Sequence, residues 1–483
     1  MFIVDCDCHN YWCSATVLEP YMEEGLFKDM FIRGERTGPR GAFPHGHRPW
    51  FHPEGFARHD VQPVEEDDNY AIMKEKHPDK YNIDVAILTG DEPIEASTLA
   101  NPYYANALCK AYNDYMIDYW LPKDDRFWGS IVVAPQDPHL AASEIRRLGS
   151  HPRIVQVLVS HGAHRPYGDP FFHPIYEACA EMDLPFAMHL GGQGGINATP
   201  IGAGPSTFFW ETHAILPQTA MTHMASLIAN GVFEKWPSLK VVVIECGVAW
   251  VPSVLWRLDV NYKALRKETP WLKRLPSEYF KDHFRFSTQP LEQPENIQHL
   301  WATLEAMDGE NTLMFASDYP HWDYDDVNKL HVPPAWREKI FGLNALDVYT
   351  RLPRPAAQAA EKGEAAMTNK HFACKVDDVP ADAAKIVTVS NMPIGVFKLE
   401  DGFHALLNIC PHKGAALCEG PICGTTKETD KKEFTYDRAG EIVRCAWHSW
   451  EFDIRSGEFL SDPKVKTRRF DVSVEGSDIY VHM

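Results

Sequence analysis

Two short motifs near the end of the chain bring cysteine and histidine together at close spacing. Cys410 and His412 are separated by one residue, and Cys445 and His448 by two. Two loops that each supply one thiolate and one imidazole can hold a pair of irons, with both thiolates on one iron and both imidazoles on the other. A zinc site is one alternative, although zinc motifs usually lack a Cys-x-His spacing. The other alternative is a set of four unrelated core residues.

The residues around the two motifs favour the iron–sulfur cluster. Trp447, Trp450 and Phe452 are placed to shield a cluster from water. Residues 372–483 resemble the Rieske ferredoxin family, including the Gly-x-x-Leu at residues 414–417. The resemblance implies a Rieske [2Fe–2S] cluster. Its implied ligands are Cys410, His412, Cys445 and His448.

The chain departs from the Rieske pattern in three places. The span between the two loops is longer than usual in this family, so we expect an extra hairpin within residues 424–440. Ser449 stands where a glycine is usual, and its hydroxyl is a potential hydrogen-bond donor that would raise the potential. Cys418 and Cys423 are not at the positions of the loop-bridging disulfide of high-potential members. We therefore expect a reduction potential in the lower part of the Rieske range.

A second set of candidate ligands lies in the first two thirds of the chain. Asp7 and His9 end the first apolar run, and side chains two residues apart on one strand point the same way. His189, Glu245 and Asp318 end three later apolar runs. Two imidazoles and three carboxylates form an environment that suits iron, manganese or zinc. These five residues are therefore predicted metal ligands.

Other residues near these runs are candidates with open roles. We expect His223 to be a further metal ligand or catalytic group if its helix faces the site, or else a core hydrogen-bonding residue. Glu245 binds a second metal, acts as a general base, or supports another ligand. His321 contacts substrate or caps the next helix. The candidates for binding an anionic substrate group are His161, His164 and Arg165.

Apolar runs that alternate with helical patterns must position these residues. We predict strands at residues 2–8, 83–90, 127–134, 154–160, 185–190, 240–246, 284–288 and 312–318. We predict helices at residues 103–119, 139–148, 174–182, 214–230, 250–265, 294–307 and 335–349. Eight nearly continuous apolar strands alternating with helices predict an α/β fold, a (β/α)₈ TIM barrel, whose strand ends converge on one mouth. A doubly wound open sheet is the alternative.

Residues 1–350 resemble the amidohydrolase superfamily, in the branch of aminocarboxymuconate-semialdehyde decarboxylase and γ-resorcylate decarboxylase. The likeness includes residues 231–237, before the sixth strand, and residues 342–345, near the end of the barrel. In that family the usual sixth-strand residue is an acid–base histidine, whereas this chain has Glu245. That difference weakens the case for ordinary decarboxylation. The metal ligands implied by the resemblance are Asp7, His9, His189 and Asp318.

Composition and charge limit the remaining possibilities. The formal net charge of −20 disfavours binding to nucleic acid or anionic membranes. No run of 18 apolar residues is present, and the first residues lack the pattern of a signal peptide, so we expect a cytoplasmic protein without a membrane span. We predict a barrel at residues 1–350, a linker at 351–368 and a small all-β Rieske domain at 369–483. Residues 12–81 are predicted to cover the active-site face.

The two predicted centres together suggest redox chemistry, because a Rieske cluster passes single electrons whereas hydrolysis and decarboxylation need none. We therefore predict an oxidoreductase, a Rieske-coupled oxygenase with one or two non-heme irons in the barrel. Its substrate would be a small aromatic or organic acid, and its electrons would come from an external ferredoxin or flavin reductase. The alternative is a zinc or manganese hydrolase or non-oxidative decarboxylase with an accessory Rieske domain. A pure electron carrier is disfavoured by the candidate ligands at the strand ends.

The order of the domains adds an expectation about assembly. The last helix of a (β/α)₈ barrel ends on the face opposite the active site, so the Rieske domain starts on the wrong side. An extended linker of about 18 residues reaches about 60 Å, but docking on a neighbouring chain is at least as easy. We therefore predict a homo-oligomer with electron transfer between subunits.

Overall fold

The computed structural model describes residues 1–10, 15–28, 30, 70–90, 92–192, 197, 208–215, 217–354, 370–389, 392–412, 414–428 and 434–482. It divides into two compact units whose main boundary lies between Leu352 and Pro353. Much of the predicted cover at residues 12–81, and most of the predicted linker, lie outside the described residues. Within the described ranges, no helix has the length and apolar character needed to cross a membrane.

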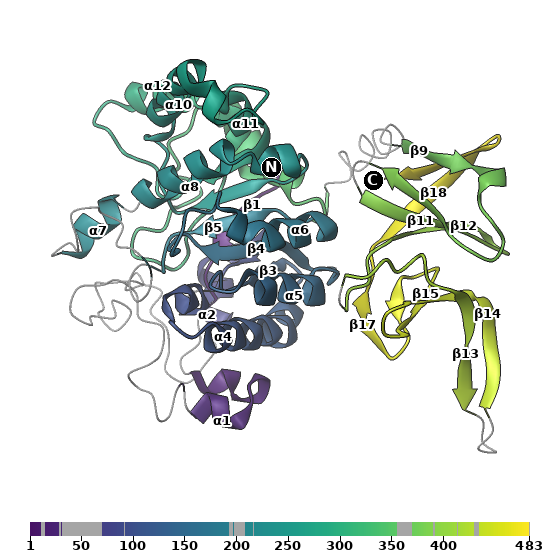
Figure 1. The fold of residues 1–483 in the computed structure, drawn as a ribbon. Coiled ribbons are helices and arrows are strands. Elements are labelled where there is room, and N and C mark those ends of the chain that lie inside the picture. The colour runs from purple at the N-terminus through teal and green to yellow at the C-terminus, as the bar shows by residue number, and fades with distance from the viewer. Residues whose placement is uncertain are drawn as a thin grey trace. The chain divides into compact units, whose positions relative to one another are not determined.

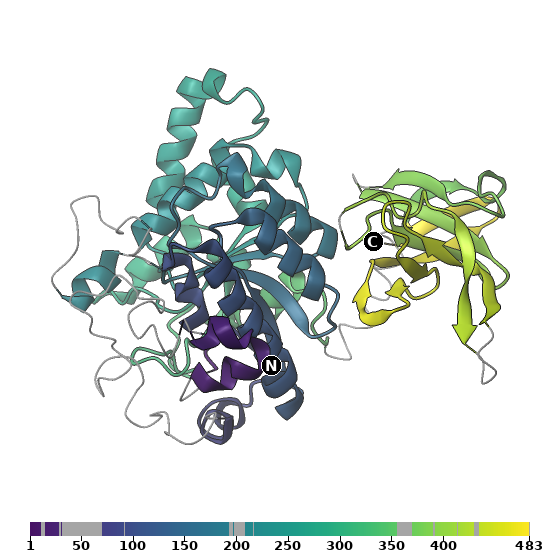
Figure 2. The ribbon, with the colours of Figure 1, turned by 60° about the horizontal axis from the view of Figure 1, so that its bottom comes forward.

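The first unit is a barrel of eight parallel strands that follow one another in sequence order. The strands are β1 (Val4–Cys8), β2 (Val85–Leu88), β3 (Phe127–Val132), β4 (Ile154–Ser160), β5 (Phe186–His189), β6 (Val241–Ile244), β7 (Phe284–Ser287) and β8 (Leu313–Met314). Helices lie outside these strands in both views (Figures 1 and 2). The predicted (β/α)₈ barrel is confirmed.

α-Helices of very different length lie between the barrel strands and after the last of them. They are α1 (Glu24–Phe27), α2 (Tyr70–Lys76), α3 (Pro78–Tyr81), α4 (Pro102–Tyr115), α5 (Pro138–Leu148), α6 (His173–Met182), α7 (Phe209–Ile215), α8 (Pro217–Ala229), α9 (Val232–Lys235), α10 (Val251–Leu265), α11 (Pro276–His283), α12 (Ile297–Ala306), α13 (Gly309–Thr312) and α14 (Asn344–Val348). The side chain of Asn296 caps α12 by accepting the backbone N–H of Gln298 at 3.1 Å. This cap explains why α12 begins later than the predicted residue 294.

Burial on both faces explains the apolar character of the strands. All seven residues of β4 are buried, including the polar residues Gln156 and Ser160. The Gln156 amide donates to the hydroxyl of Ser130 at 2.9 Å and accepts the hydroxyl of Tyr349 at 2.9 Å. The buried amide is therefore hydrogen-bonded, as a polar group in a core must be.

Strand β8 is shorter than predicted, ending at Met314 instead of residue 318. The backbone N–H of Phe315 donates to Ile340 at 2.8 Å, and that of Ser317 donates to the carboxylate of Asp5 at 2.9 Å. Because these groups bond outside a strand ladder, the regular pairing with β7 stops. The segment instead joins β1, since the N–H of Cys6 donates to the Phe315 carbonyl at 3.0 Å.

The second unit contains two antiparallel sheets. One has the order β10-β11-β12-β18-β19-β9, and the other runs in order from β13 to β17. The strands are β9 (Lys370–Lys375), β10 (Lys385–Val389), β11 (Met392–Leu399), β12 (Gly402–Leu407), β13 (Ile422–Glu428), β14 (Phe434–Arg444), β15 (Glu451–Asp453), β16 (Glu458–Phe459), β17 (Asp462–Lys466), β18 (Arg469–Glu475) and β19 (Asp478–His482). The hairpin of β13 and β14 extends beyond the rest of this unit (Figure 1) and contains the hairpin predicted at residues 424–440.

Candidate metal centres

Four buried side chains meet at the C-terminal ends of the barrel strands. Asp7 belongs to β1 and His9 follows it, His189 ends β5, and Asp318 follows β8. One ligand atom from each lies within 4.8 Å of the others. Nε2 of His9 is 2.9 Å from Oδ1 of Asp318, and Nε2 of His189 is 3.2 Å from Oδ2 of Asp7. Two imidazoles and two carboxylates form a donor set that fits manganese, iron or zinc.

Electrostatic interactions couple Asp7 with His189 and His9. Burial acts to raise the pKa of Asp7, but the positive charges of His189 and His9 outweigh it and lower that pKa. Burial acts to lower the pKa of His189, but Asp7 and Glu245 raise it to about 9. The Asp7 carboxylate therefore stays charged. Its negative charge stabilises either the protonated ring of His189 or a bound cation.

Two further predicted residues border the four ligands. Oε2 of Glu245 lies 3.7 Å from Nε2 of His189. Nδ1 of His321 lies 2.6 Å from Oδ1 of Asp318, and its ring centroid is 4.3 Å from that of His9. Ligand atoms of Glu245, Asp318 and His321 also lie within 4.8 Å of one another. The structure thus places Glu245 and His321 beside the predicted ligands, where a second ion or a substrate would contact them.

The backbone is strained where two of the carboxylates are held. Glu245, which follows β6, has φ of 57°, and Asp318 has φ of 60°. This left-handed conformation costs a residue with a side chain roughly 1–2 kcal/mol. The N–H of Glu245 donates to the hydroxyl of Ser287 at 2.9 Å, and the N–H of Asp318 donates to the Asp7 carbonyl at 3.1 Å. Strain held by such contacts is typical of functional sites.

The two cysteine–histidine loops of the second unit share one backbone geometry. The N–H of Cys410 donates to the Ala415 carbonyl at 2.7 Å, and the N–H of Cys445 donates to the Trp450 carbonyl at 2.8 Å. Each loop therefore closes on the residue five positions beyond its cysteine. The fourth position after the cysteine has positive φ in both loops: 74° at Gly414 and 59° at Ser449.

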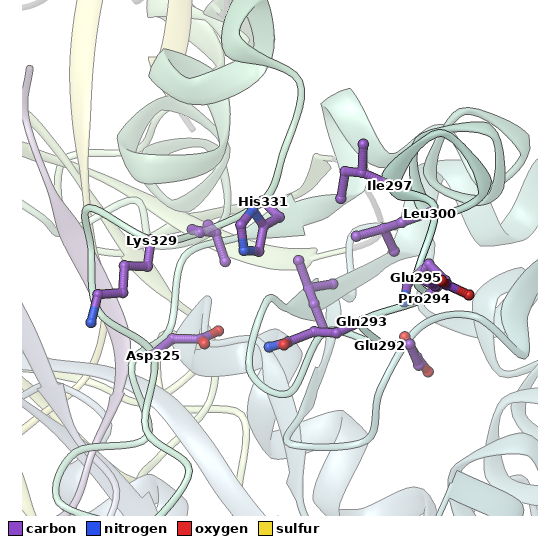
Figure 3. A pocket seen from close by; sticks show the side chains of 11 residues that line it. Glu292, Gln293, Pro294, Glu295, Ile297, Leu300, Asp325, Lys329 and His331 are labelled. Atoms are coloured by element: carbon purple, nitrogen blue, oxygen red, sulfur yellow. The ribbon is translucent and has the colours of Figure 1, made fainter.

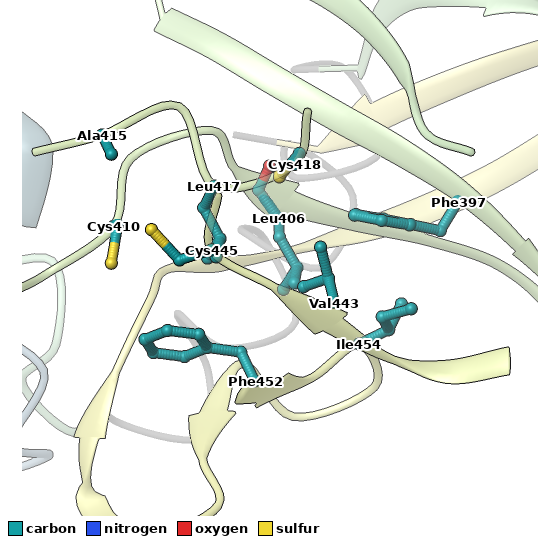
Figure 4. Packing of buried hydrophobic residues seen from close by; sticks show 10 residues of the cluster. All are labelled: Phe397, Leu406, Cys410, Ala415, Leu417, Cys418, Val443, Cys445, Phe452 and Ile454. Carbon is teal, nitrogen blue, oxygen red and sulfur yellow. Dashed lines mark hydrogen bonds between the residues drawn. The ribbon is translucent and has the colours of Figure 1, made fainter. Parts of the chain in front are cut away.

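The thiols of these loops point inward and the imidazoles lie nearer the surface. Cys410 and Cys445 are each 1% exposed and pack in a core that includes Leu417 and Phe452 (Figure 4). The ring centroids of His412 and His448, one from each loop, lie 4.5 Å apart. Two thiols and two imidazoles on facing loops fit a [2Fe–2S] cluster with one inner and one outer iron.

The two units match two different protein families. The amidohydrolase family matches residues 4–351, which is well over half of the chain, and the Rieske [2Fe-2S] domain family matches residues 369–474. The chain belongs to the amidohydrolase family. Its C-terminal part is a Rieske [2Fe–2S] domain, so the fusion predicted from the sequence is confirmed.

Relatives of the amidohydrolase barrel include decarboxylases. The γ-resorcylate decarboxylase of Polaromonas sp. is 27% identical over 288 residues, which cover 56% of this chain and 84% of the relative. A structure of 5-carboxyvanillate decarboxylase from Novosphingobium aromaticivorans has a TM-score of 0.54 and 21% identity, covering 72% of this chain and 96% of that chain. The ferredoxin component of the alkene monooxygenase system of Xanthobacter autotrophicus is 27% identical over 108 residues, 22% of this chain and 76% of the relative.

The predicted oxygenase function is wrong. Four curated relatives that match the amidohydrolase barrel are γ-resorcylate decarboxylases, and simple decarboxylation requires neither O₂ nor external electrons. The prediction took the chemistry of the barrel from the domain fused to it. Function resides in the site of each domain, so a fused electron carrier does not define the reaction of its neighbour.

His223 is not brought to the ligands of the amidohydrolase barrel. Its Nδ1 accepts the backbone N–H of Tyr167 at 3.0 Å, and its Nε2 donates to the carbonyl of His161 at 2.6 Å. Burial lowers the pKa of His223 to about 4, which keeps the ring neutral. Both ring nitrogens are therefore occupied, and His223 supports the loop after β4 instead of binding metal or substrate.

The three residues predicted to bind an anionic substrate group lie on the loop after β4. Nδ1 of His161 lies 3.0 Å from the His189 carbonyl, so His161 supports a ligand strand. The guanidinium of Arg165 lies over the ring of Phe171, with its carbon 4.6 Å from the ring centroid. The ring of His164 also packs against Phe171, at 5.3 Å between centroids. These side chains contact their own loop.

His213 on α7 was missed by the sequence analysis. Its Nε2 lies 3.6 Å from Oε1 of Glu245 and 3.8 Å from Oδ2 of Asp323. Burial acts to lower the pKa of His213, but Glu245 and Asp323 raise it above its usual value. The predicted helix began one residue later, at 214, and no local spacing connects His213 with Glu245. Only the folded chain brings this imidazole to the site.

A separate cavity of about 320 Å³ lies between the segments that follow β7 and β8 (Figure 3). Asp325 and Gln293 line it, and none of the four ligands does. The backbone N–H of Asp325 donates to the Ser317 carbonyl at 2.8 Å, next to Asp318. One wall of the cavity is therefore fixed to the ligand-bearing segment.

Proposed function

We propose that the barrel is a metal-dependent, non-oxidative decarboxylase of a small aromatic acid. The observation that carries the proposal is the group of four buried ligands, Asp7, His9, His189 and Asp318, at the ends of the barrel strands. The reaction is supported by four γ-resorcylate decarboxylases that are 25–27% identical over 52–56% of this chain. Manganese bound in the 5-carboxyvanillate decarboxylase structure supports manganese as the metal.

The substrate class that fits is a benzoate with a hydroxyl group next to its carboxylate. Such a hydroxyl supplies electron density to the ring carbon that must accept a proton when CO₂ leaves. A divalent metal held by the four proposed ligands would supply a Lewis acid for the reaction. The named substrates of the relatives, γ-resorcylate and 5-carboxyvanillate, support this class.

The reaction breaks the bond between the ring and the carboxylate and forms a ring C–H bond, so the site must deliver one proton. Two imidazole–carboxylate pairs border the ligands: His321 with Asp318, and His213 with Glu245. The side chain of His213 is 17% exposed, against 8% for His321. Because His213 retains contact with solvent, it can recover its proton after each turnover. We assign Nε2 of His213, held by Glu245, as the proton donor.

The test is an anaerobic assay of the full chain with bound Mn²⁺. We expect CO₂ and the decarboxylated phenol to form from 2,6-dihydroxybenzoate or a related hydroxybenzoate, without O₂ and without a reductant. His213→Gln should lower kcat by about 10²–10⁴-fold, the usual contribution of a general acid. The matched control is His164→Gln, which removes an imidazole packed within the β4 loop and should change kcat less than about twofold. Turnover that requires O₂ or reductant would contradict the proposal.

The Rieske domain is proposed to be an accessory electron-transfer module. Neither proton delivery nor CO₂ release needs its electrons, so reduction of the cluster should leave the anaerobic rate unchanged. The external reductase, the homo-oligomer and electron transfer between subunits stay predictions.

A further inference from the structure

A second buried group of polar side chains lies beside the four proposed ligands. It consists of Asp5, Cys8 and His77, whose ligand atoms lie within 4.8 Å of one another. Asp5 and Cys8 belong to β1, and His77 lies between α2 and α3. All three residues are 0% exposed. The group is therefore built into the barrel wall, and it shares β1 with Asp7.

The distances within this group are those of hydrogen bonds. Oδ2 of Asp5 lies 2.6 Å from Nε2 of His77 and 3.1 Å from Sγ of Cys8. The Asp5–His77 separation is ordinary for a charge-assisted hydrogen bond.

The other oxygen of Asp5 holds two backbone segments that carry ligands. Oδ1 of Asp5 accepts the N–H of Ser317 at 2.9 Å and the N–H of Asp7 at 3.2 Å. Ser317 is the residue before Asp318, so one carboxylate is bonded beside a ligand on each segment. The two segments also bond each other directly, since the Asp318 N–H donates to the Asp7 carbonyl at 3.1 Å.

His77 and the Ser317 hydroxyl also help to join the segment of Asp7 to the segment of Asp318. The hydroxyl of Ser317 lies 3.2 Å from Nε2 of His77 and accepts the N–H of Tyr319 at 3.1 Å. The His77 ring stacks on the ring of Tyr319 with centroids 4.9 Å apart and planes 20° apart. The backbone on both sides of Asp318 is therefore held by the group that holds Asp7.

We propose that Asp5 and His77 form a positioning pair that fixes the spacing between the metal ligands Asp7 and Asp318. The pair touches neither metal nor substrate and acts through the backbone of the two ligand segments. The inference rests on the metal centre of the proposed function, but not on the reaction catalysed there. Partners of this kind typically change metal affinity by 10–100-fold when they are removed.

The test measures Mn²⁺ affinity of the full chain by the electron paramagnetic resonance signal of free Mn²⁺, so it does not depend on turnover. Asp5→Asn and His77→Gln should each raise the Mn²⁺ Kd by about 10–100-fold and broaden the spectrum of bound Mn²⁺. Ser317→Ala keeps the backbone N–H to Asp5 and removes only the hydroxyl, so it should fold and raise Kd by a smaller factor.

The matched control is His283→Gln. His283 is also buried, at 3% exposed, and its ring stacks on Phe233 at 4.2 Å, but it precedes β7, at the barrel end opposite the ligands. Its loss should lower the melting temperature and leave the Mn²⁺ Kd within about twofold of the wild type.

Three results would overturn the inference. The first is a wild-type Mn²⁺ Kd in folded Asp5→Asn and Ser317→Ala variants. The second is a His283→Gln variant whose Mn²⁺ affinity is weakened equally, and the third is a wild-type chain that binds no Mn²⁺. Normal Mn²⁺ binding without any decarboxylation would refute the proposed reaction alone, and it would leave the positioning pair intact.

Discussion

The two centres of this chain are assembled in opposite ways. The proposed barrel ligands lie at the ends of strands that are far apart in sequence, and the contact between His9 and Asp318 spans 309 positions. The Rieske loops each close within six residues, from Cys410 to Ala415 and from Cys445 to Trp450. The barrel centre is thus a product of the whole fold, whereas each half of the Rieske centre is set by local backbone geometry.

The two centres should respond differently to substitutions in the chain. The barrel ligands are all buried and depend on the joining of β1 to the segment after β8. In the Rieske domain, Cys410 and Cys445 are buried, whereas His448 is exposed. We therefore expect distant changes to disturb the barrel centre and only nearby changes to disturb the cluster.

Substituting one ligand of either centre should abolish the function of that centre alone. Asp318→Asn removes a charged ligand and should lower the anaerobic decarboxylation rate by about 10³-fold or more, since metal stabilisation is worth several kcal/mol. Its Rieske spectrum should be unchanged. Cys410→Ser should abolish the Rieske spectrum and leave decarboxylation within about twofold. Joint loss of both properties in either variant would contradict the comparison.

Metal removal should affect the stability of the barrel and spare the Rieske domain. At free Mn²⁺ of 100 times its Kd, binding stabilises the folded barrel by about 2.7 kcal/mol. Chelation should therefore lower the barrel melting temperature by several degrees, measured by differential scanning calorimetry. The visible absorption of the cluster reports the other domain in the same sample. Asp318→Asn should show no such metal-dependent shift.

The affinity for Mn²⁺ should rise with pH. The pKa of His189 is raised to about 9 by Asp7 and Glu245 despite burial, so the metal-free ring carries a proton below that pH. Metal binding must release that proton, and affinity should increase about tenfold per pH unit between pH 6 and 8 and level off above 9. Affinity that does not change over this range would contradict the charge state of His189.

The smallest effect tests the equivalence of the Rieske loops. Gly414 and Ser449 occupy the same left-handed position, and a Cβ added at Gly414 meets no atom within 4 Å. Gly414→Ser should therefore retain the cluster and destabilise the domain by about 1 kcal/mol, the cost of this conformation. Ser449→Gly should change stability by less than that, because relief of strain is offset by added freedom of the unfolded chain. Chemical denaturation followed by visible absorption measures both.

The sequence predicts most of what is local or periodic. Eight apolar runs predict eight strands, and the cysteine–histidine spacings predict the cluster loops. Asp7, His9, His189 and Asp318 are predicted to meet because each ends an apolar run, and in a barrel those ends converge. The structure places these four side chains together.

What the sequence does not predict depends on tertiary contacts. His223 and His213 both lie on helices, and no local pattern shows which of them faces the ligands. The side of α8 that carries His223 faces the backbone of the β4 loop, whereas His213 reaches Glu245 from α7. In the sequence, Asp5 is only one residue of a predicted strand. Its role becomes visible in the folded chain, where its carboxylate contacts His77.

The joining of β1 to the segment after β8 also constrains the order of events during synthesis. Asp7 and His9 are synthesised before the other proposed ligands, and Asp318 follows more than three hundred residues later. A nascent chain can therefore offer at most part of the ligand set until its barrel is nearly complete. Metal loading must be one of the last steps in the maturation of the barrel, and a chain truncated before residue 318 should bind Mn²⁺ weakly at best.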